Sequence, residues 1–313
     1  MIDRAAIAAA RQKLLTHPGF LRTTPLMRLP GAALGVACAE VWLKLEQTQV
    51  GGSFKARGML YRLLANPVPD SGVIIASGGN AGIAVAAAAQ ALGVRCEVFV
   101  PEVSPEAKRA RLRALGAEVV VTGAAYSQAF EACVERQKAT GALQAHAYDQ
   151  PEVVAGAGTL ALEMEEQGGR LPDTVLVSVG GGGLIGGVAA WVQSRAHVVA
   201  LEPERAPTLH AARAAGQPVD VEVGGLAADS LGARRIGSLC WDISQRHIHD
   251  ALLLPDDAIR AAQLWLWKEL KLAVEPAAAL GLAALQTGAY QPQPQETVAL
   301  ILCGANFDPA SLA

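Results

Sequence analysis

The sequence predicts an α/β fold with two lobes, each built on a mostly parallel, twisted sheet flanked by helices. Short apolar segments alternate with helical segments along the chain, which is the order found in βαβ units. The chain has 313 residues, which is enough for two domains of ordinary size. Hydrophobic residues make up 51% of the chain and charged residues 18%, so each lobe has enough apolar material for a core.

The smaller lobe is predicted from about residue 68 to 147, where the alternation is clearest. Gly93 and Gly116 each follow a helical segment, as expected for a glycine that stops a helix. Ser104 and Pro105 supply an N-cap and a proline for the first turn of a helix. We therefore expect strands at 73–76, 96–100 and 118–121, and helices at 80–92, 105–115 and 126–140.

The larger lobe is predicted to combine residues 1–67 with residues 148–313. Its sheet would contain a strand at 41–45 and the apolar segments at 174–179, 197–201, 248–254 and 297–303. Helices are expected at 4–15, 55–64 and 184–194, after Asp256, and at 276–285.

Composition and charge exclude several classes of protein. A net charge of −3 gives no electrostatic footprint for nucleic acid or an anionic membrane. The 5 cysteines are scattered and form no Cys-x-x-Cys pair, so neither a disulfide framework nor a zinc site is indicated. Residues 71–94 carry no charge, but a Ser-Gly-Gly-Asn turn divides them into a strand and a helix. We expect a soluble cytoplasmic protein whose N-terminus lacks a secretory signal.

Residues 51–58, with the sequence GGSFKARG, contain the most informative lysine. The two glycines permit a tight turn, and Ser53 is positioned to cap the helix that follows. Lys55 would then lie at the positive end of that helix beside apolar Phe54, and both effects lower the pKa of an amine. Such an amine can attack a carbonyl and form a Schiff base. The alternative is an ordinary solvated lysine after a turn.

A run of four glycines, Gly180 to Gly183, follows a predicted strand and precedes the helix that begins at Leu184. Backbone N–H groups without side chains can converge on one anion there, and a phosphate is the natural ligand. The same residues also fit a dinucleotide fingerprint, with Glu202 at the end of the next strand. A nicotinamide enzyme is therefore an alternative at this point.

Two further motifs lie at predicted strand ends. In the Ser77-Gly78-Gly79-Asn80 turn, loop amides and side-chain donors would suit a carboxylate, although Asn80 could simply cap the helix. Cys303 comes at the carboxyl end of the last strand, the edge where open α/β sheets bind ligands. A lone cysteine there could instead be packing.

Together and in this order, the motifs resemble the fold-type II pyridoxal-phosphate enzymes, within them the threonine/serine dehydratases and their relative serine racemase. The resemblance runs from Arg22-Thr23-Thr24-Pro25-Leu26 to Cys303-Gly304-Ala305-Asn306, and it includes Lys44-Leu45-Glu46 and Val274-Glu275-Pro276. It covers nearly the whole chain and makes the nicotinamide alternative unlikely.

The resemblance implies that pyridoxal phosphate lies between the lobes as a Schiff base on Lys55, which is also the general base. Asn80 would contact the 3′-hydroxyl of the cofactor, and neutral Cys303 its pyridine nitrogen. The residues assigned to the cofactor are Phe54, Lys55, Asn80, Gly180, Gly181, Gly182, Gly183, Leu184, Gly225, Glu275 and Cys303. The residues assigned to the substrate are Ser77, Gly78, Asn80 and Ala81. Glu275 would either face the ring or cap the next helix.

The chain departs from the family pattern at informative positions. Serine racemases have a serine where this chain has Gly78, so racemisation is disfavoured. Glu202 matches one ligand of the racemase metal site, but the second ligand position is Thr208. A divalent cation is therefore in doubt, while a monovalent cation held partly by carbonyls stays open. Gly224-Gly225-Leu226 departs from the threonine dehydratase sequence, so the substrate need not be threonine.

These observations predict a lyase that converts L-threonine or L-serine to a 2-oxo acid and ammonia. The alternatives are a dehydratase for 3-hydroxyaspartate or a hydroxyectoine-derived substrate, a serine racemase, and a cofactor-binding protein without turnover. We expect a homodimer that acts on a small amino acid.

Overall fold

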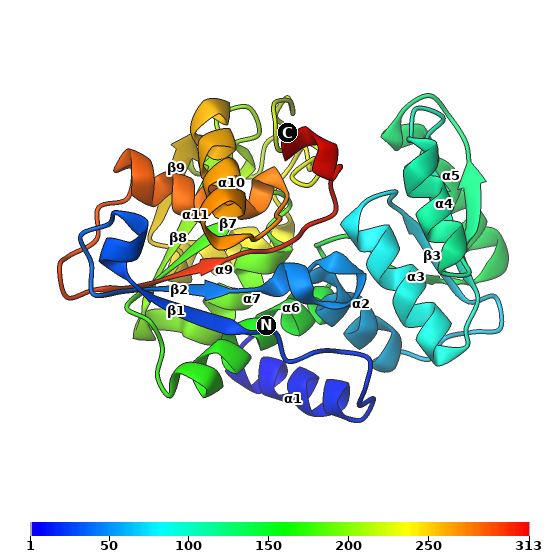
Figure 1. Ribbon diagram of the computed structural model, residues 1–313. Coiled ribbons are helices and arrows are strands. Elements are labelled where there is room, and N and C mark those ends of the chain that lie inside the picture. The colour runs from blue at the N-terminus through cyan, green and yellow to red at the C-terminus, as the bar shows by residue number, and fades with distance from the viewer. Residues whose placement is uncertain (1, 313) are drawn as a thin grey trace.

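The computed structural model describes residues 2–312, which form two separate sheets (Figure 1). The larger sheet has six strands in the order β1-β2-β10-β7-β8-β9. Only β1 and β2 pair antiparallel; every other pair in this sheet is parallel. Its strands are β1 (Leu26–Pro30), β2 (Glu40–Lys44), β7 (Thr174–Ser178), β8 (His197–Pro203), β9 (Asp250–Leu254) and β10 (Thr297–Ile301).

The smaller sheet has four parallel strands in the order β5-β4-β3-β6. They are β3 (Val73–Ala76), β4 (Cys96–Val100), β5 (Glu118–Val121) and β6 (Leu143–Gln144). Every residue of β3 and β4 is buried, because helices cover both faces of the sheet. Val73 and Ile75 contribute to one apolar cluster with α3, whereas Ile74 contributes to another with α5. This odd–even division follows from the alternation of side chains along a strand.

Eleven α-helices flank the sheets within the described residues. They are α1 (Arg4–Leu15), α2 (Lys55–Leu64), α3 (Asn80–Leu92), α4 (Glu106–Ala114), α5 (Tyr126–Thr140), α6 (Pro151–Gly168), α7 (Gly183–Val192), α8 (Thr208–Ala215), α9 (Ser238–His247), α10 (Asp256–Leu270) and α11 (Pro276–Thr287). No helix in residues 2–312 is long and apolar enough to cross a membrane.

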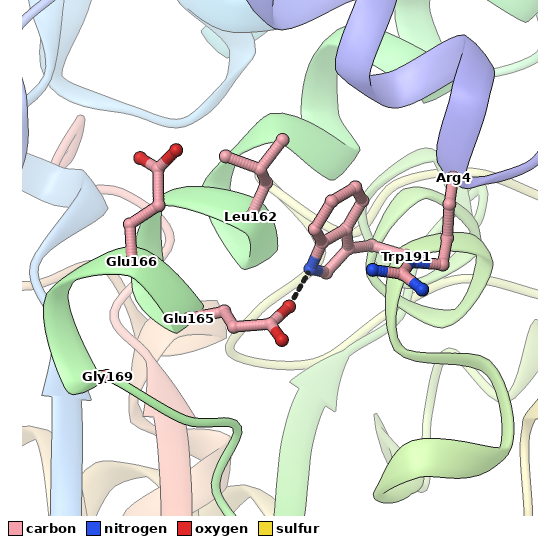
Figure 2. Close-up of a pocket in the computed structure, with 6 residues that line it drawn as sticks. All are labelled: Arg4, Leu162, Glu165, Glu166, Gly169 and Trp191. Atoms are coloured by element: carbon pink, nitrogen blue, oxygen red, sulfur yellow. Dashed lines mark hydrogen bonds between the residues drawn. The ribbon is translucent and has the colours of Figure 1, made fainter.

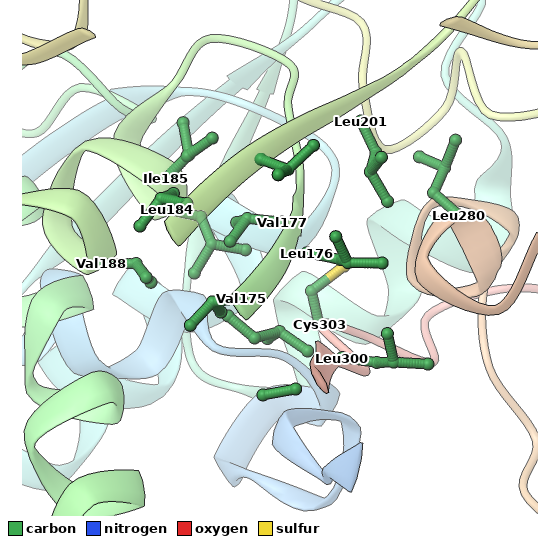
Figure 3. Close-up of a cluster of buried hydrophobic side chains, with 14 of the residues drawn as sticks. Val175, Leu176, Val177, Leu184, Ile185, Val188, Leu201, Leu280, Leu300 and Cys303 are labelled. Atoms are coloured by element: carbon green, nitrogen blue, oxygen red, sulfur yellow. The ribbon is translucent and has the colours of Figure 1, made fainter. Parts of the chain in front are cut away.

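The main hydrophobic core surrounds the parallel strands of the larger sheet. Figure 3 shows Leu184, Ile185 and Val188 of α7 on one side of β7, and Leu280 of α11 on the other. Because both faces of β7 are covered, all five of its residues are buried. The burial holds the end of β7 in a fixed position, and the glycine run begins directly beyond it.

Helix α2 connects the two halves of the molecule. It packs against α6 on one side and α3 on the other. Met59, Leu60 and Leu63 of α2 belong to the same apolar cluster as α3. The N-terminal end of α2 carries Lys55 and contacts the segment after β10, because the N–H of Phe54 donates to the carbonyl oxygen of Cys303 over 3.0 Å.

Candidate active site

Lys55 is the first residue of α2 and is only half-buried, with its amine directed into a cavity. Its Nζ donates to the carbonyl oxygen of Ala147 over 2.6 Å and lies 4.9 Å from the centre of the Phe54 ring. Burial lowers the pKa of Lys55 to about 8, while the carboxyl group of Glu275 opposes this shift. The lowered pKa expected from the sequence is confirmed, and burial is its largest cause.

The predicted cap by Ser53 is wrong. Phe54 occupies the N-cap position of α2, and no side chain caps this helix. Ser53 is extended and forms an isolated bridge with Gly304. Its hydroxyl oxygen is buried without a hydrogen-bond partner among the described residues. The glycines before it have the predicted role, since Gly51 and Gly52 have φ values of 72° and 76°.

The glycine run joins β7 to α7 and lines the same cavity as Lys55. Close packing is one reason for the missing side chains: a Cβ on Gly181 would lie 2.3 Å from the ring of Tyr148, and one on Gly182 would lie 2.5 Å from Cys240. Gly182 also has a φ of 91°. No described residue accepts a hydrogen bond from the N–H groups of residues 180–184. These donors at a helix N-terminus suit a phosphate.

The Ser77–Gly82 segment contains the turn from β3 to the first residues of α3, and its residues 77–81 line a second cavity next to the first. A Cβ on Gly82 would lie 1.9 Å from the carbonyl oxygen of Ser77, so the turn requires glycine there. The helix begins at Asn80 with Gly79 as its N-cap, and the Asn80 side chain does not cap it. No described residue accepts from the N–H groups of residues 79–82. A carboxylate could therefore bind at this turn.

Asn80 and Glu275 face each other across the cavity wall. The amide nitrogen of Asn80 donates to Oε1 and Oε2 of Glu275 over 3.0 and 3.1 Å. Glu275 is the N-cap residue of α11, but its side chain does not cap the helix. Of the two roles left open for Glu275, helix capping is excluded. Burial raises the pKa of Glu275 to about 7, and the hydrogen bond from Asn80 opposes the shift.

Cys303 lies two residues beyond the end of β10 and lines the cavity with Lys55. Burial raises its pKa well above the ordinary value, and the nearby carboxyl group of Glu275 acts in the same direction. The thiol is therefore neutral, as the sequence predicts. Phe54 and Leu184 also line this cavity.

The second cavity has a volume of about 470 Å³ and opens beside Lys55. The residues predicted to bind the substrate, Ser77, Gly78, Asn80 and Ala81, all lie in its lining. The sequence interpretation missed several other lining residues, including Tyr126, Tyr148, Ser230 and Arg234. Tyr126 is the first residue of α5, and the other three lie in irregular segments outside the helices and strands, so no local pattern identified them.

Two predicted site residues are placed elsewhere. Gly225 lines neither cavity; its φ is 82° and a Cβ there would meet Asp256. Glu202 is fully buried and accepts from the N–H groups of Leu209 and His210 over 2.8 Å each. Its carboxylate thus stabilises the start of α8. Residues 2–312 contain no cluster of three or more histidine, cysteine or acidic side chains that could hold a metal. A cation held by Glu202 together with carbonyl groups stays a prediction.

A third cavity, of about 360 Å³, lies on the surface beside α1, α6 and α7 (Figure 2). The polar groups around it pair with each other. The indole N–H of Trp191 donates to Glu165 over 2.7 Å, and the guanidinium group of Arg4 lies 4.8 Å from the Trp191 ring centre. It contains no nucleophile or unpaired amide cluster, so the cavities around Lys55 form the candidate site.

Residues 18–304 match the family described as pyridoxal-phosphate dependent enzyme. The chain belongs to this family. It is 33% identical to an L-threonine ammonia-lyase of Thermotoga maritima over 87% of this chain and 69% of that protein. It is 35% identical to a phenylserine dehydratase of Ralstonia pickettii over 99% of this chain and 95% of that protein. The structure of maize serine racemase has a TM-score of 0.91 and 28% identity, covering 99% of this chain and 95% of that one.

The site fits the family's cofactor. The unpaired N–H groups of residues 180–184 suit its phosphate, and the amine of Lys55 suits its aldehyde. The neutral thiol of Cys303 suits an unprotonated ring nitrogen. Pyridoxal phosphate is therefore the cofactor, and the fold-type II architecture predicted from the motifs is confirmed.

Proposed function

We propose that this enzyme is a dehydratase that converts a β-hydroxy amino acid, L-threonine or L-serine in the first instance, to a 2-oxo acid and ammonia. The observation that carries this proposal is the convergence of three groups on adjacent cavities: the amine of Lys55, the free amides after β7, and the free amides after β3. The names of the relatives from Thermotoga maritima and Ralstonia pickettii support the same reaction class.

Lys55 is proposed to hold the cofactor through its Nζ as a Schiff base and, once released, to remove the proton from Cα of the substrate. With a pKa of about 8, roughly a tenth of this amine is unprotonated at pH 7, far more than for an ordinary lysine, and the unprotonated amine is the state a base requires. When bound, pyridoxal phosphate supplies an electron sink for the charge left on Cα. Loss of hydroxide from Cβ and hydrolysis of the released enamine complete the reaction without an oxidant.

The turn at Ser77–Gly82 is proposed to hold the substrate carboxylate. Its unpaired N–H groups lie at the N-terminus of α3, where the helix dipole favours an anion. Ser77 is half-buried in the cavity lining and adds a hydroxyl donor. Carboxylate binding here would place Cα near Lys55, which lines the same cavity.

A second candidate substrate class has a larger β-substituent, such as phenylserine or 3-hydroxyaspartate. The cavity volume of about 470 Å³ is in the range of roughly 300–1,000 Å³ that holds ligands much larger than threonine. Aromatic Tyr126 and basic Arg234 both line it, and these side chains suit an aryl group and a carboxylate respectively. The relative named phenylserine dehydratase aligns over almost the whole of both chains.

Racemisation is the less favoured reaction. The position where serine racemases carry a serine is Gly78, which lines the cavity but has no proton to deliver.

We further propose that residues 68–147 form the small domain, that residues 1–67 and 148–313 form the large domain, and that the enzyme is a cytoplasmic homodimer. Size-exclusion chromatography with light scattering checks the dimer.

Release of 2-oxo acid and ammonia tests the function. The yellow holoenzyme is offered L-serine, L-threonine, L-threo-phenylserine and both diastereomers of 3-hydroxyaspartate, with the Lys55→Ala variant as control. We expect equimolar 2-oxo acid and ammonia from at least one substrate with the wild-type chain alone. A cofactor-loaded enzyme that releases neither product from any substrate would overturn the dehydratase assignment.

A further inference from the structure

The side chain of Asn306 follows β10 of the larger sheet. It connects this part of the molecule to α3 and α4, two helices that flank the smaller sheet. Its amide oxygen accepts from Nη1 of Arg111 on α4 over 2.6 Å. Its amide nitrogen donates to the side-chain oxygen of Asn80 over 2.6 Å and to the carbonyl oxygen of Gly51 over 2.7 Å. Asn306 therefore joins α4, the start of α3 and the turn before Lys55.

The direction of these hydrogen bonds is determined by chemistry. A guanidinium group can only donate, so the oxygen of Asn306 must face Arg111 and its NH₂ group must face Asn80. Asn80 then receives this bond on its oxygen, and its own NH₂ group is directed to Glu275 and the cavity. Glu275, at the other end of this series of hydrogen bonds, has acceptor oxygens and favours the same orientation of the Asn80 amide.

We propose that Arg111 is a positioning residue that acts through Asn306 to present the NH₂ group of Asn80 to the cofactor. The cofactor atom beside Asn80 is then a hydrogen-bond acceptor, in practice a negatively charged oxygen on the ring. This inference rests on the family's cofactor and not on the proposed substrate. Binding of the cofactor without any substrate therefore tests it separately from the dehydratase activity.

Other basic residues of α4 provide matched controls. Arg113 forms an ion pair with Glu106 within the same helix. Lys108 does cross to the other half of the molecule, where it pairs with Asp229. No hydrogen bond among the described residues links Lys108 to Asn80, so Lys108 serves as a control for the loss of a general contact between the lobes.

The experiment measures the dissociation constant of pyridoxal phosphate from dialysed holoenzyme, its absorption spectrum, and the thermal midpoint. Arg111→Met should weaken cofactor binding about tenfold and reduce the long-wavelength band that an anionic ring oxygen produces. Arg111→Lys retains a donor and should restore most of both signals. Arg113→Met should match the wild-type chain. Equal behaviour of Arg111→Met and wild type, or of the two methionine variants, would overturn the proposal.

A second variant distinguishes orientation of the Asn80 amide from a contact that only holds the two lobes together. Asn306→Asp keeps the contact with Arg111 and makes it an ion pair, but it removes the NH₂ group that faces Asn80. We expect weaker cofactor binding and the same spectral change, with a thermal midpoint that does not fall. Cofactor binding as tight as in the wild-type chain would contradict the orientation argument.

Discussion

Lys55 and Arg57 lie two residues apart on α2, yet their surroundings give them opposite charge behaviour. The guanidinium group of Arg57 is buried between Glu46 and Glu163, with N–O distances of 2.8 and 2.9 Å. Lys44 adds a second buried contact to Glu163 at 2.7 Å. These carboxylates raise the pKa of Arg57 despite its burial. The amine of Lys55 instead meets a carbonyl oxygen, and its pKa falls to about 8.

The difference shows what distinguishes a structural charge from a reactive one: a structural charge is fully paired with opposite charges, and a reactive one is not. In the buried network Arg57 and Lys44 are compensated by Glu46 and Glu163, Arg11 adds a longer contact to Glu163 at 3.6 Å, and α2 is held in position. Around Lys55 the counter-charge is incomplete, since burial raises the pKa of Glu275 to about 7 and keeps Cys303 neutral. The pKa values of Lys55 and Glu275 are displaced towards neutrality, which suits these groups to proton transfer, whereas those of Arg57 and Glu163 are displaced away from it.

Removal of the reactive charge should have the largest effect on activity. Lys55→Ala should abolish the Schiff base absorption and lower 2-oxo acid release by roughly 10³-fold or more, because one amine acts as anchor and base. Far-ultraviolet circular dichroism should be unchanged. Normal turnover by a correctly folded variant would remove Lys55 from the mechanism.

Removal of one structural charge should instead affect stability. Glu163→Gln leaves Lys44 and Arg57 undercompensated and should cost ~3–5 kcal/mol in the free energy of unfolding, measured in urea. Glu135→Gln, which breaks the exposed pair with Lys138, should cost less than ~1 kcal/mol. The pKa of Glu163 is lowered to about 2, with burial opposing the effect of Arg57 and Lys44. Its contribution is therefore complete above about pH 4.5 and lost as the pH falls towards 2. A similar decrease in the free energy of unfolding for Glu163→Gln and Glu135→Gln would show that the buried network stabilises the fold no more than an exposed ion pair does.

The pH dependence of cofactor capture sharpens the contrast. Below its pKa of about 8 the amine of Lys55 is protonated and cannot attack an aldehyde; above it, the free amine can. The rate at which cofactor-free protein binds pyridoxal phosphate should therefore rise with pH, with a midpoint near 8. A midpoint near 10.5, the ordinary lysine value, would show that burial does not act as described.

The smallest expected effect is the gain of a proton donor at position 78, which lines the same cavity as Lys55. A Cβ on Gly78 would lie 3.2 Å from Oγ of Ser104 and 3.3 Å from Val100, so Gly78→Ser needs only small adjustments. We expect a low rate of D-serine formation from L-serine, detected by chiral chromatography. Recovered substrate without any D-isomer would count against Gly78 as the determinant.

Local patterns were sufficient to predict much of the fold. The helices at 55–64, 80–92 and 126–140 have the predicted bounds because glycines and prolines mark their ends. Helices α6, α8 and α9 were not predicted. Pro151 and Gly169 do mark the ends of α6, but residues 153–164 are all buried, so this helix lacks the alternation of apolar and polar faces that identifies a surface helix. The order of strands in each sheet depends on long-range pairing that no local pattern contains.

The candidate site was predictable to a similar extent. Motifs identified Lys55, the glycine run and Cys303, since their chemistry requires particular residues at strand and helix ends. Tyr148 was not identified, although its ring packs against Gly181, because that contact joins segments far apart in the chain. The hydrogen bonds that the carboxylate of Glu202 accepts at the start of α8, six residues later, were likewise not predicted from the sequence.

The position of β10 has a consequence for how the protein is made. Strand β10, residues 297–301, lies between β2 and β7 in the middle of the six-stranded sheet. The four-stranded sheet has all its strands once residue 144 has left the ribosome, whereas the six-stranded sheet lacks an internal partner until residue 301 has emerged. At about 5–20 residues per second, this interval lasts roughly 8–30 seconds. During it, the edges of β2 and β7 lack their partner, and an unpaired strand edge is a site where another chain can pair.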